Sequence, residues 1–256
     1  MKIRTIAFAS LIAVSSVSSA VPARAMAPKA AITCDLKGPL GELAQIKAGA
    51  SASTSKELSV RKDLLKASMD CNAREARALA ASVSELDETS RAASSLQKRY
   101  GAELATAASF VASRTERIDS LETVEDSKAL ARELKEWRDT AYNPLAWQAS
   151  QLIFMSKNVL LASSGEKRAR QLKARISLLP DSTENKALDE RTHEARALIA
   201  EAQDDLAGAI SYLKDGGVTQ QERVAAKQKE ALDALGRAYG LLLQVSDAIP
   251  VSDLAL

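Results

Sequence analysis

The chain has little of the residue types on which most enzyme chemistry depends. It contains one histidine, His193, and two cysteines, and aromatic residues make up 4% of it. A single histidine excludes zinc sites built from several histidines, and no cysteine cluster takes their place. Glu190 precedes His193 by three residues, as in carboxylate di-iron bundles, but those sites need a second such motif. We therefore expect no metal site and place His193 on the polar side of a helix.

The sequence signatures of nucleophilic catalysis and cofactor binding are also missing. The chain has no G-x-S-x-G elbow, no phosphate-binding glycine loop, no calcium loop and no haem-attachment motif. Ser53-Thr-Ser-Lys56 and Ser164-Gly-Glu-Lys167 match the S-x-x-K of penicillin-binding enzymes, but the companion K-T-G and S-D-N elements are absent. We interpret Ser164 as the start of a helix. The sequence thus predicts no catalytic residue, no cofactor and no enzyme activity.

Long apolar runs are scarce, and the one at the N-terminus is short. Lys2 and Arg4 precede an uncharged, mostly apolar run over residues 5–17, and small residues then offer cleavage frames that end at Ala20 and Ala25. This order is typical of a secretory signal peptide, and the run is shorter than the ~20 residues of a transmembrane helix. We expect residues 1–25 to be a signal peptide and the protein to be exported to the periplasm, the cell envelope or the exterior.

An excess of charge of one sign is also missing once the signal is removed. The whole chain holds 35 basic and 33 acidic residues. Residues 1–25 contain three basic residues and no acid, so the remainder has 32 basic and 33 acidic residues and a net charge of −1. Nucleic-acid binding needs a basic surface. We therefore expect no nucleic-acid partner. The apolar segment over residues 144–162 is interrupted by Gln148, Gln151, Lys157 and Asn158, so we also expect no transmembrane helix in the mature chain.

The two cysteines, Cys34 and Cys71, follow the predicted signal peptide. An even number in an oxidising compartment predicts one disulfide. Two buried free thiols are an alternative. Lipid attachment at Cys34 is a third, although Ala31-Ile32-Thr33 is a poor lipoprotein cleavage site.

Glycine and proline are few, and what remains is rich in the strongest helix formers. No stretch alternates with a period of two, so no strand is predicted. The predicted fold class is all-α, an elongated helical bundle with antiparallel coiled-coil-like hairpins. We divide the chain into a signal peptide at 1–25, a leader with one short helix from about Leu40 to Ala48 at 26–52, a helical bundle at 53–249 and a tail at 250–256. A sub-division of the bundle near residue 120 is left open.

An apolar repeat of seven residues predicts a long helix after Ser55. Two series starting at Leu58 and Lys62 reach Ala107 and Val111, and twelve of their sixteen positions are apolar. This spacing is typical of the a/d seam of a coiled coil. The stretch from Asp87 to Ser95 is the weak part, where the helix is expected to break or turn. The sixteen seam positions are Leu58, Lys62, Leu65, Met69, Asn72, Ala76, Leu79, Val83, Leu86, Ser90, Ala93, Gln97, Tyr100, Leu104, Ala107 and Val111.

Capping signals predict the helices that follow. Thr123 begins a helix that runs to Tyr142, with Asp126 in its first turn. Two further helix starts are predicted at Asn143-Pro144 and at Ser164-Gly165. Capping boxes are predicted for Asp181 with Glu184 and for Thr219 with Glu222. The predicted helices cover 123–142, 144–162, 165–179, 181–215 and 219–249. The last two carry long apolar stripes and flank a Gly-Gly turn, so an antiparallel hairpin is expected.

One cluster of large side chains stands out in a chain built mainly of alanine and leucine. Trp137, Tyr142, Trp147 and Phe154 lie within eighteen residues, together with Arg138. One interpretation is a local core wedge at the Asn143-Pro144 corner. The other is a contact surface formed by Trp137, Arg138, Tyr142 and Trp147, since Trp, Tyr and Arg are favoured at interaction hot spots. Trp137 is the more plausible contact residue, and Trp147 is expected to be core.

Three segments carry a resemblance: Leu58-Ser-Val-Arg-Lys-Asp-Leu64, Glu136-Trp-Arg-Asp-Thr-Ala-Tyr-Asn-Pro144 and Glu166-Lys-Arg-Ala-Arg170. Over residues 55–180 they resemble a pattern in uncharacterised exported helical proteins of small-genome bacteria. The resemblance implies no activity and no site residue. From the sequence we expect an exported, non-enzymatic helical-bundle protein with a structural or protein–protein interaction role in the cell envelope. Its partner is an unknown envelope protein or a second copy of itself. The alternative is a helical carrier of an apolar ligand such as a lipid.

Overall fold

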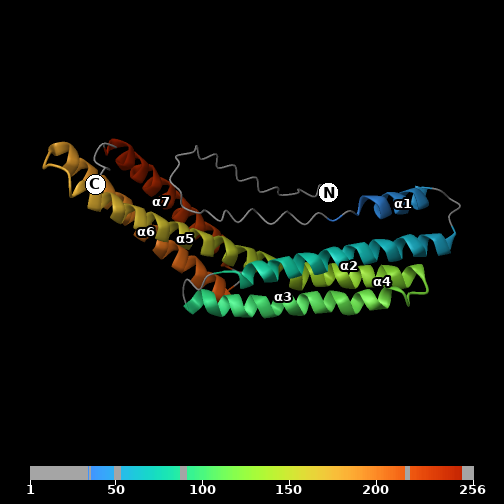
Figure 1. The fold of residues 1–256 in the computed structure, drawn as a ribbon. Coiled ribbons are helices and arrows are strands. Elements are labelled where there is room, and N and C mark those ends of the chain that lie inside the picture. The colour runs from blue at the N-terminus through green and yellow to red at the C-terminus, as the bar shows by residue number, and fades with distance from the viewer. Residues whose placement is uncertain (1–33, 35, 49–52, 87–90, 217–219, 250–256) are drawn as a thin grey trace. The chain divides into compact units, whose positions relative to one another are not determined.

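The computed structural model describes residues 34, 36–48, 53–86, 91–216 and 220–249 (Figure 1). Every regular element within these ranges is a helix and none is a strand, so the predicted all-α class is confirmed. The predicted signal peptide and C-terminal tail lie outside the described residues. The elements are α1 (Lys37–Ala48), α2 (Thr54–Ser84), α3 (Arg91–Ile118), α4 (Val124–Trp137), η1 (Arg138–Tyr142), α5 (Asn143–Ile176), α6 (Thr183–Gly216) and α7 (Gln221–Ala248).

The seam between residues 58 and 111 is formed by two helices, because α2 ends at Ser84 and α3 begins at Arg91. The break falls in the stretch that the sequence marked as weak. Every seam residue whose burial is described is buried or half-buried. A repeat of seven positions fits one long helix or two helices that face each other, and α2 and α3 take the second arrangement.

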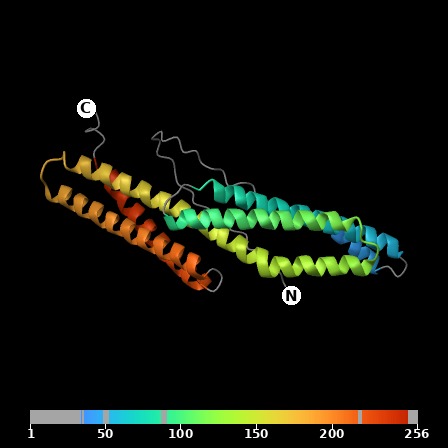
Figure 2. The ribbon, with the colours of Figure 1, turned by 90° about the horizontal axis from the view of Figure 1, so that it is seen from below.

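Side chains at both ends of the α2–α3 pair define their antiparallel direction. Lys66 donates to the Asp119 carboxylate over 2.6 Å. At the other end, the Gln97 amide donates to the carbonyl of Leu86 over 3.0 Å. The two helices therefore pack side by side, as Figures 1 and 2 also show.

The predicted helix start at Thr123 is confirmed in atomic detail. The Thr123 hydroxyl accepts from the backbone N–H of Asp126 over 3.1 Å, and the backbone N–H of Thr123 donates to the Asp126 carboxylate over 3.1 Å. This reciprocal pair is a capping box. The hydrogen bonds, the Thr123 hydroxyl first among them, hold the pKa of Asp126 below its usual range. The box is therefore intact at neutral pH and is lost as the pH falls through that lowered pKa.

The α-helix α5 begins at Asn143 with Pro144 in its first turn, as predicted, but Asn143 does not cap it and the chain is already helical before it. Asn143 has helical φ and ψ of −60° and −42°, and its N–H donates to the carbonyl of Arg138, five residues back. Pro144 has no N–H to donate to the preceding turn. The π-helical turn η1 widens the helix directly before the proline, so α4, η1 and α5 form one continuous helical path.

The predicted start at Ser164-Gly165 is wrong, because α5 continues through it. Ser164 caps no helix, and its hydroxyl donates to the carbonyl of Leu160 over 2.9 Å. Gly165 is buried, and a Cβ placed there would lie 3.1 Å from the Cδ1 of Ile199 and 3.5 Å from the ring of Tyr239. The glycine therefore allows α6 and α7 to approach α5 closely.

The capping box predicted at Asp181 is wrong, and the one predicted at Thr219 falls on a residue outside the described ones. The Ser182 hydroxyl, one residue after the predicted Asp181, accepts from the backbone N–H of Asn185 over 3.1 Å. At the start of α7 the N-cap is Gln220, which makes no side-chain capping bond, and Thr219 lies outside the described residues. Several residues within a few positions can serve as a cap, so sequence spacing alone leaves the choice open.

The stripes predicted for the last two helices are confirmed. All of their members are buried: Leu188, Ala195, Ile199, Ala202, Leu206, Ala209 and Leu213 on α6, and Val224, Gln228, Ala231, Leu235, Ala238, Leu242, Val245 and Ile249 on or directly after α7. The two helices pack against each other, and Lys227 of α7 donates to Asp205 of α6 over 2.7 Å. The coiled-coil geometry predicted for this pair stays a prediction.

The helix α5 contributes to two groups of packed helices (Figures 1 and 2). It contacts α2 and α3, and it also contacts α6 and α7. The larger cluster of buried side chains draws residues from α2, α3, α5, α6 and α7, whereas a smaller cluster joins α2, α3 and α4. The continuous path from α4 to α5 therefore links both parts of the core.

Replacing Thr123 with alanine removes the side-chain half of the capping box. We expect the free energy of unfolding to fall by about 1 kcal/mol, the usual effect of losing a threonine cap, measured by urea denaturation at neutral pH. Thr106→Ala is the matched control, because Thr106 lies in the exposed middle of α3 and bonds only to the carbonyl of Ala102. Equal losses in the two variants would contradict the capping role.

Candidate functional site

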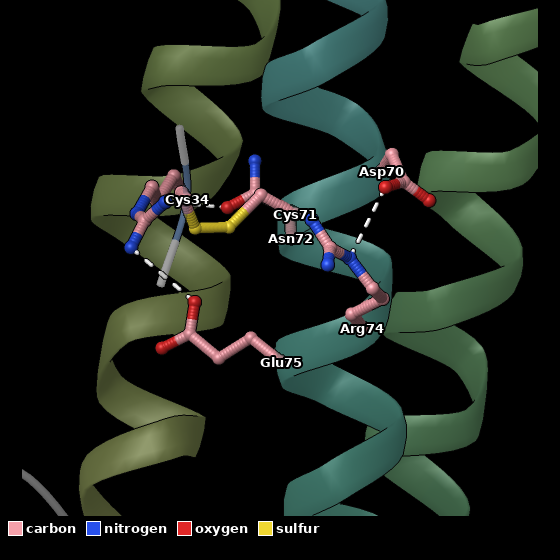
Figure 3. Close-up of a disulfide and its surroundings, with 7 residues drawn as sticks. Cys34, Asp70, Cys71, Asn72, Arg74 and Glu75 are labelled. Atoms are coloured by element: carbon pink, nitrogen blue, oxygen red, sulfur yellow. Dashed lines mark hydrogen bonds and ion pairs between the residues drawn. A yellow bond between two sulfur atoms is a disulfide. The ribbon is translucent and has the colours of Figure 1, made fainter. Parts of the chain in front are cut away.

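The two cysteines of the chain are joined, as the sequence predicted. Cys34 and Cys71 form a disulfide with their Cα atoms 5.7 Å apart (Figure 3). Cys34 is exposed, whereas Cys71 is buried in the middle of α2. The bond ties the chain ahead of α1 to α2. Helix α1, which begins three residues before the predicted start at Leu40, also packs on α2.

A polar contact lies beside the disulfide. Asn72 directly follows Cys71, and its side-chain oxygen accepts a hydrogen bond from the guanidinium of Arg138, the first residue of η1. The other arm of the guanidinium reaches the Glu75 carboxylate over 3.5 Å. Asn72 is only 4% exposed, so this contact gives a buried amide the partner that it needs. Sequence analysis missed the contact, although Asn72 was a polar exception in an apolar seam.

The predicted aromatic cluster packs around this contact. Trp137 stacks on Phe110 of α3, with ring centroids 4.7 Å apart, and on Tyr142, with centroids 5.3 Å apart. Tyr142 is buried, and the half-buried Trp137 contacts both core clusters. Trp147 is half-buried against the larger cluster. The structure therefore brings Trp137, Arg138 and Tyr142 together, with packing roles that favour the core-wedge interpretation.

The surroundings of Tyr142 keep its hydroxyl protonated and add a contact to its ring. Burial raises the pKa of the Tyr142 hydroxyl, and the nearby Glu75 carboxylate raises it further. The phenol therefore stays protonated at physiological pH and does not act as a base. The Arg138 guanidinium lies 5.9 Å from the centre of the Tyr142 ring, which adds a cation–π contact. The arrangement cross-links η1, α3 and α2 beside the disulfide.

His193 is exposed on α6, next to Arg191 and Glu194, which are also exposed, as predicted for the polar side of a helix. Among the described residues, no group of three or more His, Cys, Asp or Glu side chains could hold a metal ion. Within the same residues, none of the helices combines the length and apolar content needed to cross a membrane. Comparisons of the chain with protein-family models, curated proteins and solved structures find no match.

Replacing Arg138 with alanine removes the partner of the buried Asn72 amide. We expect a loss of about 1.5–3 kcal/mol in the free energy of unfolding, as for a hydrogen bond to a charged group. Arg74→Ala is the matched control on α2, because Arg74 pairs with Asp70 at the surface (Figure 3). Exposed pairs of this kind contribute below about 1 kcal/mol. A loss at Arg138 no larger than at Arg74 would contradict the proposed cross-link.

Replacing Cys34 with alanine opens the loop of 37 residues between the cysteines. The entropy of an unfolded chain closed over such a loop predicts a loss of ~3–4 kcal/mol in the free energy of unfolding. Cys34 is the better position than Cys71, because its side chain is exposed and the substitution leaves no cavity in the core. Reduction of the unmodified protein should produce the same loss in urea denaturation. A loss below ~1 kcal/mol in both experiments would show that the bond does not constrain the folded core.

Proposed function

We propose that the protein is exported and acts without chemistry, as a helical structural or interaction component of the cell envelope. The observation that carries this proposal is the bond between Cys34 and Cys71, the two cysteines of the chain. Disulfides persist in oxidising compartments and are rare in the cytosol. The signal-peptide pattern of residues 1–25 supports the same compartment.

A role without chemistry is supported by how the polar residues of the cluster are used. Arg138 bonds to both Asn72 and Glu75, and the Tyr142 hydroxyl is kept protonated by burial. The polar side chains join η1 to α2 and are used in contacts between these two elements. They therefore favour a scaffold over an enzyme.

An interaction role is supported by large apolar side chains at the surface. Leu160 and Leu161 of α5, and Leu232 and Leu243 of α7, are exposed although the stripes on the opposite faces of these helices are buried. Burying such side chains against a partner is favourable. The lipid-carrier alternative needs an apolar cavity. The groove between α2 and α3 is open to solvent and partly charged, so it is not an apolar cavity. It is lined by Asp70, Arg77, Glu116 and Asp119 together with Met69, Ala73, Ala112 and Thr115.

Fractionation of cells that produce the protein tests the proposed compartment. We expect the protein in the envelope or the medium, with an N-terminus at Val21 or Met26 and no thiol that alkylates before reduction, as read by mass spectrometry. An intact N-terminus that contains Lys2, or two alkylatable thiols, would contradict export. Capture of envelope proteins with the purified protein then tests the interaction role.

The contact surface predicted at Trp137 is tested by Trp137→Ala, with Trp137→Phe as a control that keeps a ring. Because Trp137 stacks between Phe110 and Tyr142, we expect the alanine variant to lose ~3 kcal/mol of stability and the phenylalanine variant to lose less. Partner capture by the folded fraction should not change. An intact fold with capture weakened by ~2 kcal/mol or more would instead identify Trp137 as a contact residue.

A further inference from the structure

Helices α5 and α7 lie in a parallel register that two hydrogen bonds define. The Tyr239 hydroxyl donates to the carbonyl of Leu161 over 2.9 Å, and Arg168 donates to the Ser246 hydroxyl over 2.8 Å. Both bonds join residues 78 positions apart. The same offset places Phe154 of α5, which is 39% exposed, level with Leu232 of α7. Phe154 and Leu232 therefore lie at the same height on two adjoining helices.

The outward face of α7 contains two leucines with two glycines between them. Leu232 is 41% exposed and Leu243 is 61% exposed. Gly236 and Gly240 recur at the spacing of one helical face, and a Cβ added to either would meet nothing within 4 Å. We call the face formed by Leu232, Gly236, Gly240 and Leu243 the α7 outer face. It is an apolar surface that no other described element covers.

Charged residues of opposite sign flank the α7 outer face. Lys229 lies one turn before Leu232, and Asp247 lies one turn after Leu243. Both side chains belong to exposed residues, and neither is ion-paired with another described residue. Lys229 thus places a positive charge near one end of the face and Asp247 a negative charge near the other.

The order of residues on this face is self-complementary about Ala238. Gly236 and Gly240 each lie two residues from Ala238, and Lys229 and Asp247 each lie nine residues from it. Leu232 and Leu243 lie six and five residues from it on opposite sides. When two copies of α7 lie antiparallel about this level, each Lys229 meets the Asp247 of the other copy and each Leu232 meets Leu243.

We infer that the α7 outer face binds the same face of a second copy of this chain, with the two helices antiparallel about a two-fold axis. Such a contact is isologous and closes at two subunits. Glycines at its centre let the two backbones approach closely, while the leucines and Phe154 bury apolar surface on either side. A parallel arrangement would instead place Lys229 against Lys229 and Asp247 against Asp247, and like charges repel.

This inference names a partner for the proposed interaction role. The biological relevance of the dimer rests on that proposed function, whereas the formation of the dimer does not. Self-association is measured on purified protein, whereas export is measured by fractionation and N-terminal mass. A dimer found without export, or export found without a dimer, would therefore show which of the two proposals fails.

The first test compares glycine variants by analytical ultracentrifugation. Protein expressed from the full sequence and purified with its disulfide intact should show a concentration-dependent equilibrium between monomer and dimer. We expect Gly236→Leu and Gly240→Leu to raise the dissociation constant at least tenfold. Gly101→Leu is the matched control, since Gly101 is also helical with open space at its Cβ, and it should leave dimerisation unchanged. Leucine has a higher helix propensity than glycine, so the melting temperatures of the variants should not fall. A weaker dimer can then be attributed to the lost contact and not to unfolding.

The second test uses charge reversal to read the register. Lys229→Glu alone places Glu against Asp247, and Asp247→Lys alone places Lys against Lys229, so each variant should dimerise at least several-fold more weakly. A mixture of the two variants restores both ion pairs in a heterodimer and should recover the original dissociation constant. A monomer at all concentrations, insensitivity to the glycine substitutions, or no recovery in the mixture would overturn the inference. Binding of this face to lipid vesicles or to another protein by a strictly monomeric chain would overturn it as well.

Discussion

The continuous helical path from Val124 to Ile176 is the feature on which the rest of the described structure depends. It contributes to the packing against α2 and α3 and also to the packing against α6 and α7. A proline in its interior would normally break it, because the ring removes one hydrogen bond and clashes with the preceding turn. The π-helical turn at Arg138–Tyr142 absorbs this disruption, so that both groups of helices share one rigid element.

The same turn is linked to its neighbours by several side-chain contacts. Arg138 bonds to Asn72, which lies next to the Cys34–Cys71 disulfide, and Trp137 and Tyr142 stack at the two ends of the turn. The widened turn is therefore held by polar and aromatic contacts, next to the disulfide on α2. Because π-helical turns are less stable than regular helix and are retained where they have a role, we interpret these contacts as what stabilises the shared path.

The exposed apolar side chains are separate from this cluster. The residue types that most often form interaction hot spots, Trp137, Arg138 and Tyr142, are used in packing between helices. Exposed apolar surface is instead supplied by Leu232 and Leu243, in helices otherwise patterned for burial on one side. The proposed interaction role therefore rests on α7, whose leucine side chains are exposed. The proposed compartment rests on the Cys34–Cys71 disulfide.

The sequence alone determined the features that depend on neighbours along the chain. The apolar stripe of α7, the cap at Thr123 and the all-α class follow from helical periodicity and local hydrogen bonds, which are nearly independent of the rest of the fold. The pairing of Cys34 with Cys71 followed from there being two cysteines. The burial of Asn72 was visible as a polar exception, but its partner lies 66 residues away and no local pattern identifies it.

Only the tertiary structure decided where helices end. Asn143-Pro144 and Ser164-Gly165 both carry helix-start signals, yet the helix continues through both. A glycine costs an isolated helix about 1 kcal/mol relative to alanine, but the missing side chain at Gly165 lets Ile199 and Tyr239 pack closely against α5. Burial of the neighbouring leucine and isoleucine side chains stabilises the helix by more than that, at about 1.5–3 kcal/mol each. Local propensity is the smaller term wherever a helix is packed on several sides, and the partners that outweigh it are distant in sequence.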